Sequence, residues 1–308
     1  MKQLILHHYP MSPFAEKIRL ILGFKGLHWS SVMIPNIMPK PDVTALTGGY
    51  RKTPVMQIGA DIYCDTALIA DVLEELSPQP TLYPGGVEAA SRTLAQWTDS
   101  TLFWTSVAYA MQPAGLAHMF AGVPPEGVKA FGDDRNIFRA NLPRTRPADA
   151  IAAFSLYLPR LEAMLGGQEF FFGASPSIAD FSIYHNFWFV ERGGPVAAIF
   201  DSYPAIQAWR ARMAAFGHGT FDKLDSGAAI GIARDAAAEP PRGKGAETHG
   251  IAVGERVVVA ATDTGTDPIE GTLYGATGDR ISIAREDARA GKVVVHFPRL
   301  GFELRRAK

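Results

Sequence analysis

The spacing of hydrophobic residues changes along the chain, and the first 80 residues mix a strand period with a helix period. LILHHY (4–9) is a short apolar run that ends at a proline and predicts a buried strand, and apolar residues then recur at helical spacing over 13–25. The segment 35–50, which holds several prolines and a Gly-Gly pair, is predicted to be mostly irregular. The other predicted elements are strands at 28–34, 54–59 and 61–64 and a helix at 66–76. This order predicts an α/β domain over residues 1–82.

The pattern then becomes helical, and strand-like runs disappear up to about residue 216. Glycine pairs at 166–167 and 193–194 are typical of helix ends. The predicted helices are 88–111, a shorter one within 125–139, 147–165, 177–190 and 204–215. We therefore expect an all-helical domain over residues 87–230.

The last quarter of the chain changes character again. Residues 234–250 (RDAAAEPPRGKGAETHG) contain no large apolar side chain and predict a linker. About five short strand-like segments follow within 251–304, separated by turn signals. They predict a small all-β domain over 251–308, with an SH3-like barrel as the expected form. Packing on the helical domain, dimer contacts and partner binding are all open roles for it.

Composition narrows the class of protein. The chain has 308 residues, of which 47% are hydrophobic and 20% charged, as in a soluble globular protein of two or three domains. The formal net charge of -1 provides no basic field that would attract nucleic acid or anionic lipid. Residues 251–308 alone carry nearly balanced charges, so we expect no nucleic-acid partner for the β domain either.

Cysteine and histidine usage and the N-terminal pattern indicate a cytoplasmic protein. Cys64 is the single cysteine, which excludes an intrachain disulfide and a cysteine-based zinc site, and its apolar strand favours a buried structural thiol. The eight histidines show no metal-ligand spacing, so no metal is predicted. The first ten residues do not form a signal-peptide pattern, and no apolar run reaches the roughly 18 residues of a membrane span.

Ser12-Pro13 stands at the junction between the first predicted strand and helix. Serine followed by proline is an ordinary N-cap and N1 pair, and from position alone a helix cap is the favoured interpretation. A hydroxyl beside the positive end of a helix can also stabilise a thiolate and so activate a thiol nucleophile. Both interpretations stay open at this point.

Two later dipeptides also allow both a structural and a ligand-binding interpretation. Thr53-Pro54 opens the third predicted strand, either with a cis peptide bond or as a trans proline on an edge strand. Asp65-Thr66 precedes a helix, where both residues are good caps. A helix start with a hydroxyl also suits a carboxylate, and the Asp65 carboxylate suits an ammonium group.

These features together resemble the glutathione S-transferase superfamily, whose thioredoxin-like domain precedes an all-helical domain. Ser177 and Asp180 support the resemblance, because they form the S-x-x-D start of a buried helix. The resemblance covers residues 1 to about 216 and leaves the β domain outside. It departs from the family in TALTGGYRKTPV (44–55), where an Asn-Pro pair is common.

The resemblance implies a site and a function. Ser12 would donate a hydrogen bond to the sulfur of glutathione, Pro54 would follow a cis bond, and the backbone of Val55 would pair with the cysteinyl part. With serine at position 12, this residue cannot carry out thiol–disulfide exchange. The glutathione-binding residues that it implies are Lys52, Thr53, Pro54, Val55, Asp65 and Thr66, with Arg51 beside Lys52 at the glycyl carboxylate.

The implied enzyme adds the thiolate of glutathione, its co-substrate, to a hydrophobic electrophile. Tyr9, Trp104 and Tyr109 are candidates for the electrophile pocket, with core and interdomain packing as the alternative for the helical residues. The extra β domain motivates the other candidate function, a non-catalytic glutathione-binding or protein-interaction module on the same scaffold. A homodimer is expected for many members of the family and is left open for this chain.

Overall fold

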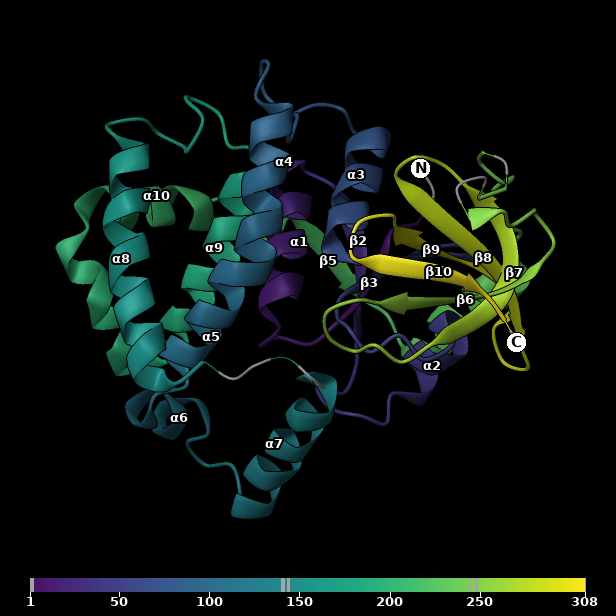
Figure 1. Ribbon diagram of the computed structural model, residues 1–308, viewed down its shortest axis with the longest axis horizontal. Helices are drawn as coiled ribbons and strands as arrows, with labels where there is room; N and C mark the ends of the chain where they lie inside the picture. The colour runs from purple at the N-terminus through teal and green to yellow at the C-terminus, as the bar shows by residue number, and fades with distance from the viewer. Residues whose placement is uncertain (1–2, 140–141, 143–144, 244, 247–248, 308) are drawn as a thin grey trace.

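The computed structural model describes residues 3–139, 142, 145–243, 245–246 and 249–307. Figure 1 shows a helical bundle on one side, a central unit of strands and helices, and a set of C-terminal strands on the other side. The central unit begins the chain and is a thioredoxin-like α/β arrangement. Its elements are β1 (Ile5–His8), α1 (Pro13–Phe24), β2 (His28–Met33), α2 (Pro41–Thr47), β3 (Val55–Ile58), β4 (Asp61–Cys64) and α3 (Thr66–Leu76).

The predicted strands and helices of this unit are confirmed, apart from helix α2. β1 pairs in parallel with β2 and antiparallel with β3, which pairs antiparallel with β4. The prediction of an irregular segment was wrong at α2, because its proline and glycine lie at the helix ends. Pro41 occupies the first turn, and Gly48 ends the helix with a φ of 83°.

Helices make up the second unit, as predicted. The predicted helix 88–111 is continuous except for a π-helical turn in its middle. The capping box formed by Ser177 and Asp180 is present. The unit comprises α4 (Glu88–Trp97), η1 (Thr98–Leu102), α5 (Phe103–Ala110), α6 (Pro113–Met119), α7 (Pro125–Arg139), α8 (Pro147–Leu165), α9 (Ile178–Glu191), η2 (Gly194–Ser202) and α10 (Pro204–Ala214). The family carries such a helical domain after its thioredoxin-like one.

Two elements that the sequence did not predict return the chain to the central sheet. β5 (Thr220–Lys223) pairs in parallel with β2 and forms one edge of the sheet. α11 (Ser226–Asp235) follows, capped by Asp225, and overlaps the first two residues of the predicted linker. Strand β5 is exposed and short, so its hydrophobic pattern carries little signal.

The C-terminal strands continue the sheet of the first unit. They are β6 (Arg256–Ala261), β7 (Ile269–Ala276), β8 (Arg280–Asp287), β9 (Gly291–Pro298) and β10 (Phe302–Arg306), and they agree with the five predicted strand segments. β9 pairs in parallel with β4, which gives one ten-stranded sheet in the order β10-β6-β7-β8-β9-β4-β3-β1-β2-β5. Among the described residues no pairing joins β10 to β9, so closure into an SH3-like barrel is not shown, and the domain boundaries stay predictions.

Buried polar groups mark the place where the C-terminal strands join the first unit. His296 Nε2 lies 2.9 Å from Asp61 Oδ1, and its Nδ1 lies 2.8 Å from Ser282 Oγ. Tyr63 stacks on the His296 ring, with the ring centroids 4.6 Å apart. Directional bonds of this kind fix the register in which β9 adds to β4.

The central sheet separates two hydrophobic cores. Met56 and Ile58 of β3 face the core shared with α1, α3 and the helical bundle, whereas Val55 faces the core shared with α2, α11 and the C-terminal strands. Alternate residues of one strand point to opposite faces, so β3 contributes to both cores. Among the described residues, no helix combines the length and the apolar character needed to cross a bilayer.

His7 and His8 are buried on opposite faces of β1. His7 Nε2 lies 2.8 Å from Gln57 Oε1, and burial lowers the pKa of His7 to about 4. Arg19 Nη1 lies 3.0 Å from His8 Nδ1 and can only donate, so His8 accepts there and is neutral. Burial and the Arg19 charge together lower the pKa of His8 to about 3.

We expect the free energy of unfolding to fall as the pH drops from about 6.5 to 4.5, by up to about 1.4 kcal/mol per pH unit for each histidine. The unfolded chain binds protons on both histidines near pH 6.5, whereas the folded chain binds them only near pH 4 and 3. Urea denaturation over this range measures the slope, which His8→Gln should reduce. His28→Gln, at an exposed histidine, is the control. Equal slopes in all three proteins would contradict the assignment.

Candidate functional site

Ser12 caps helix α1 and also faces the loop before β3. Its Oγ accepts a hydrogen bond of 3.2 Å from the Ala15 N–H, which confirms the cap. The same hydroxyl donates to the Thr53 carbonyl oxygen across a long 3.4 Å. The acceptor side of Ser12 therefore serves the helix, and its single donor is only weakly held.

The Thr53-Pro54 peptide bond is cis, as predicted. Val55 is fully buried and lies between His7 of β1 and Cys64 of β4 in the sheet. Thr53, half-buried just before the strand, is the residue of this loop whose backbone borders Ser12. The Thr53 backbone therefore faces Ser12, whereas Val55 is paired inside the sheet.

Asp65 has an unusual backbone at the start of α3. Its φ of 77° is the one positive value at a non-glycine residue in the described part of the chain, and such conformations cost of order 1–3 kcal/mol and cluster at functional sites. The carboxylate accepts 2.9 Å from the Ala67 N–H. Burial raises the pKa of Asp65, and the charges of Lys52 and Lys17 oppose that rise.

A buried ion pair lies beneath the start of α3 and joins the two domains. Lys17 Nζ, with its side chain 1% exposed, lies 2.6 Å from Asp99 Oδ2 and 3.4 Å from Thr66 Oγ1. Asp99, in the π-helical turn, also lies 2.9 Å from His185 Nε2 of α9. Although burial opposes it, Lys17 and His185 lower the pKa of Asp99 to about 2. Sequence reasoning missed Asp99 and His185, because no local pattern marks partners so far apart in the chain.

Lys40 was also missed, since it falls in the segment predicted to be irregular. Its Nζ donates 3.1 Å to Thr53 Oγ1 and lies 5.4 Å from the centre of the Tyr9 ring. The residue is 5% exposed and forms no ion pair with the described residues. Burial and the neighbouring charges of Arg135 and Arg51 lower the pKa of Lys40 to about 8.

Helix α7 extends from the helical bundle to the loops of the first unit, as Figure 1 shows. Arg135 Nη2 donates to Tyr9 Oη at 3.3 Å and to the Asn36 carbonyl at 2.7 Å. Asp134 accepts from Arg51 Nη2 at 2.9 Å. The predicted pocket residue Tyr9 therefore lies beside Lys40 and Arg135, on the same side as Thr53.

Lys52 and Arg51, predicted at the glycyl carboxylate, already have carboxylate partners. Lys52 Nζ lies 2.5 Å from Asp263 Oδ1, and Arg51 lies between Asp134 and, at 3.9 Å, Asp267. Asp263 and Asp267 belong to the β6–β7 connection, outside the region that resembles the family. Lys40 is therefore the buried cation at this side of the site that forms no ion pair with the described residues.

The other predicted pocket residues lie apart. Trp104 is half-buried, next to Phe103, whose ring contacts Phe14 of α1 with centroids 4.7 Å apart. Tyr109 packs on Phe154 in the core of the helical bundle, with centroids 4.8 Å apart. Its hydroxyl points to the Val196 carbonyl. The geometry favours the packing alternative for Tyr109.

Metal and thiol chemistry find no support elsewhere in the described part of the chain. Its residues hold no group of three or more His, Cys, Asp or Glu placed to bind a metal ion. Cys64 is buried, and burial raises the pKa of its thiol, which keeps it protonated. The absence of a metal stays a prediction.

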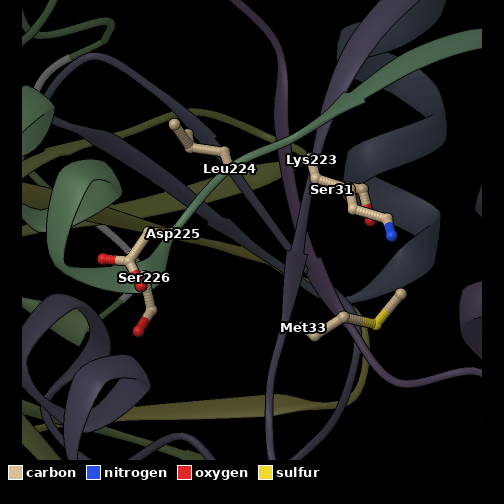
Figure 2. A pocket seen from close by; sticks show the side chains of 6 residues that line it. All are labelled: Ser31, Met33, Lys223, Leu224, Asp225 and Ser226. Carbon is tan, nitrogen blue, oxygen red and sulfur yellow. The ribbon is translucent and has the colours of Figure 1, made fainter.

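A separate shallow pocket of about 300 Å³ opens at the β2–β5 edge of the sheet. Figure 2 shows Met33 on one side and Asp225 and Ser226 on the other. The remaining lining residues are Ser31, Lys223 and Leu224. None of the candidate residues contributes to it, so we assign it no role in the site.

Comparisons with known families agree with the domain order. Residues 6–81 match the family described as "Glutathione S-transferase, N-terminal domain", and residues 139–212 match "Glutathione S-transferase, C-terminal domain". A crystal structure of a GST-like protein from Pseudomonas syringae is 44% identical, superposes with a TM-score of 0.84, and covers 100% of both chains. That likeness therefore includes the C-terminal strands.

More distant relatives match parts of the chain. A glutathione S-transferase from Rhodospirillum rubrum F11 is 18% identical over 69% of this chain and 88% of that chain, with a TM-score of 0.52, and shows the fold alone. FtsZ-localized protein A of Caulobacter vibrioides is 27% identical over 99 residues. That match spans 30% of this chain and only 43% of the curated relative.

Proposed function

Because the chain belongs to the glutathione S-transferase superfamily, we propose that it binds glutathione and transfers its thiolate to a hydrophobic electrophile. One observation carries the proposal. Ser12, the cis Thr53-Pro54 loop and Asp65-Thr66 come from three segments and meet at the N-termini of α1 and α3, linked through the contacts of Ser12 with Thr53 and of Lys17 with Thr66.

Ser12 would act on the sulfur. Its donor, held only across 3.4 Å by the Thr53 carbonyl, can turn to a thiolate, and the N-terminus of α1 adds its positive dipole end. Both effects stabilise the thiolate, so the thiol releases its proton to solvent at neutral pH. The sulfur lone pair then forms a bond to the electrophilic carbon, and the electron pair of the broken bond leaves with the displaced group.

The γ-glutamyl end of glutathione would lie on the start of α3. The Asp65 carboxylate suits its ammonium group, which would favour the ionised form of Asp65 that burial opposes. The Thr66 hydroxyl and the backbone N–H groups at the start of α3 suit its carboxylate. Lys17, 3.4 Å from Thr66 Oγ1, adds positive charge below.

The glycyl carboxylate would lie at Lys40, the buried cation beside Thr53. Lys52 and Arg51 would add positive charge at longer range. The backbone of Thr53, in preference to that of Val55, would pair with the cysteinyl part of glutathione. Tyr9 and Trp104 would border the electrophile, and Tyr109 is left out.

Lys40→Met should raise the KM for glutathione about tenfold and change kcat little, because a charge-assisted hydrogen bond to a bound carboxylate is lost. Steady-state kinetics with varied glutathione measure both constants. Lys129→Met, an exposed lysine of α7, is the control and should match the parent protein. An unchanged KM would remove Lys40 from the site.

Calorimetry with glutathione and a conjugation assay with an aryl halide test the proposed function together. Binding accompanied by turnover supports the enzyme. Binding without turnover supports the second candidate, a non-catalytic binding or interaction protein on the same scaffold. The partial match to a relative named FtsZ-localized protein A supports that candidate for the matched region. No binding at millimolar glutathione would reject the enzyme and leave the protein-interaction form of the second candidate.

Homodimer formation and a cytoplasmic location, which the sequence leads us to expect, stay predictions.

A further inference from the structure

The β6–β7 loop (residues 262–268) reaches from the C-terminal strands to the glycyl side of the site. Asp263 Oδ1 lies 2.5 Å from Lys52 Nζ, and Asp267 Oδ2 lies 3.9 Å from Arg51 Nη1. Both carboxylates are also about half exposed, with 53% of each side chain accessible. They therefore stand at the rim of the site and act on its charge.

Anchors at its centre hold this loop in place. Thr264 is buried, and the Gly265 N–H donates 2.9 Å to the Phe138 carbonyl at the end of α7. Gly265 has a φ of 57°, and a Cβ there would meet the Phe138 ring at 3.0 Å, so glycine permits the close approach. The loop thus contacts the helical domain and the first unit at once.

The C-terminal strands also fix the chain that leads into the site, from α2 to Thr53. Arg289 Nη2 lies 2.6 Å from Asp42 Oδ1, and Arg285 Nη1 donates 2.9 Å to the Ala45 carbonyl. Tyr50 packs against Phe302 of β10, with centroids 6.3 Å apart. The segment that holds Lys52 and Thr53 is therefore fixed by strands that lie outside the two matched family domains.

The two loop carboxylates change the charge that a ligand would meet. Apart from the loop carboxylates, Asp134 is the ion-pair partner that the set of four cationic side chains has here among the described residues. Asp263 pairs with Lys52, and Asp267 lies near Arg51. Among the described ion pairs this leaves Lys40 without a partner, and Lys40 suits a ligand that brings one carboxylate. The cations concerned are Lys40, Arg51, Lys52 and Arg135.

We propose that Asp263 and Asp267 are specificity-determining residues, which select thiol peptides that carry a single carboxylate at the glycyl end. The inference rests on the proposed function and assigns a role to the C-terminal strands. A peptide with two carboxylates at that end meets the loop carboxylates at short range and is repelled.

The test compares two thiol peptides by calorimetry, glutathione and γ-glutamyl-cysteinyl-glutamate, which has a second carboxylate at the same end. The parent protein should prefer glutathione. The double variant Asp263→Asn/Asp267→Asn should shift the affinity ratio about tenfold toward the dianionic peptide, and its binding should become more sensitive to salt. Glu270→Gln, which removes an exposed carboxylate from β7, is the matched control.

A ratio that the double variant leaves unchanged would overturn the assignment alone. Failure of the parent protein to bind either peptide would overturn the proposed function and the assignment with it, so the two failures are distinguishable. Hydrogen exchange of the ligand-free proteins provides a second readout: amides of residues 48–53 should exchange faster in the double variant than in Glu270→Gln. Equal exchange there would contradict the idea that the loop holds this segment.

Discussion

Ser12→Ala should lower kcat for glutathione conjugation about 100-fold while the affinity for glutathione changes little. Removal of one donor from a developing or stabilised anion has effects of this size, and the remaining contacts of the peptide stay intact. The thiol of bound glutathione should titrate at a higher pH in the variant, because its thiolate loses the hydroxyl donor. Steady-state kinetics, calorimetry and ultraviolet absorbance of the thiolate measure the three quantities.

The same substitution removes a helix cap, and a control must separate that effect. Ser12 accepts from the Ala15 N–H, and a lost cap costs about 1 kcal/mol of stability. The control is Asp225→Ala, which removes the cap of α11. The Asp225 carboxylate accepts a 2.8 Å hydrogen bond from the Gly227 N–H, and this residue is far from the site residues in the sequence. This substitution should lower stability similarly and leave kcat intact. Equal kcat in Ser12→Ala and the parent protein would sink the assigned role.

Asp99→Ala should lower the free energy of unfolding by about 3–5 kcal/mol, because it leaves the buried Lys17 ammonium without its carboxylate. Lys17 Nζ lies 2.6 Å from Asp99, and among the described residues its other hydrogen bond is the 3.4 Å contact with Thr66. Urea denaturation at pH 7 measures the loss. Asp133→Ala, which breaks an exposed ion pair with Lys129, is the control and should have little effect.

The Lys17–Asp99 ion pair also predicts that a second substitution restores stability and that stability depends on pH. Adding Lys17→Met to Asp99→Ala removes the stranded charge, so the double variant should be more stable than Asp99→Ala. The folded pKa of Asp99, about 2, lies below the usual value near 4. Its contribution is therefore complete above about pH 4 and lost as the pH falls toward 2. An Asp99→Ala protein as stable as Asp133→Ala would show that the ion pair does not matter.

Much of the fold could be predicted because its signals are local. The alternation of strand and helix periods, the glycine stops and the capping box each occupy a few neighbouring residues. The sequence predicts an irregular segment at α2 because proline and glycine usually interrupt helices, whereas here Pro41 and Gly48 stand at the two ends of a helix. The junction of β4 with β9 could not be predicted, since it depends on side chains such as Asp61 and His296 that are distant in sequence.

The candidate site likewise contains residues with a local sequence signal and residues without one. Ser12, Pro54 and Asp65 are recognisable because their neighbours in the chain form caps and strand starts. Lys40 and Asp99 can be recognised as site residues only from their contacts with Thr53 and Lys17, which are distant in the sequence and adjacent in the fold. The pairing of Lys52 with Asp263 joins residues 211 positions apart, and no pattern in the sequence indicates it.

The pairing of β4 with β9 also has a consequence for how the protein is made. His296 lies 235 residues after Asp61, so during synthesis β4 is an uncovered sheet edge for roughly 10–50 s at ordinary translation rates. Uncovered edges invite pairing with other chains, and an inward-pointing charge is one defence that natural sheets use against it. We expect the Asp61 carboxylate to have this effect on β4 until β9 is made, and in the finished sheet it is the partner of His296.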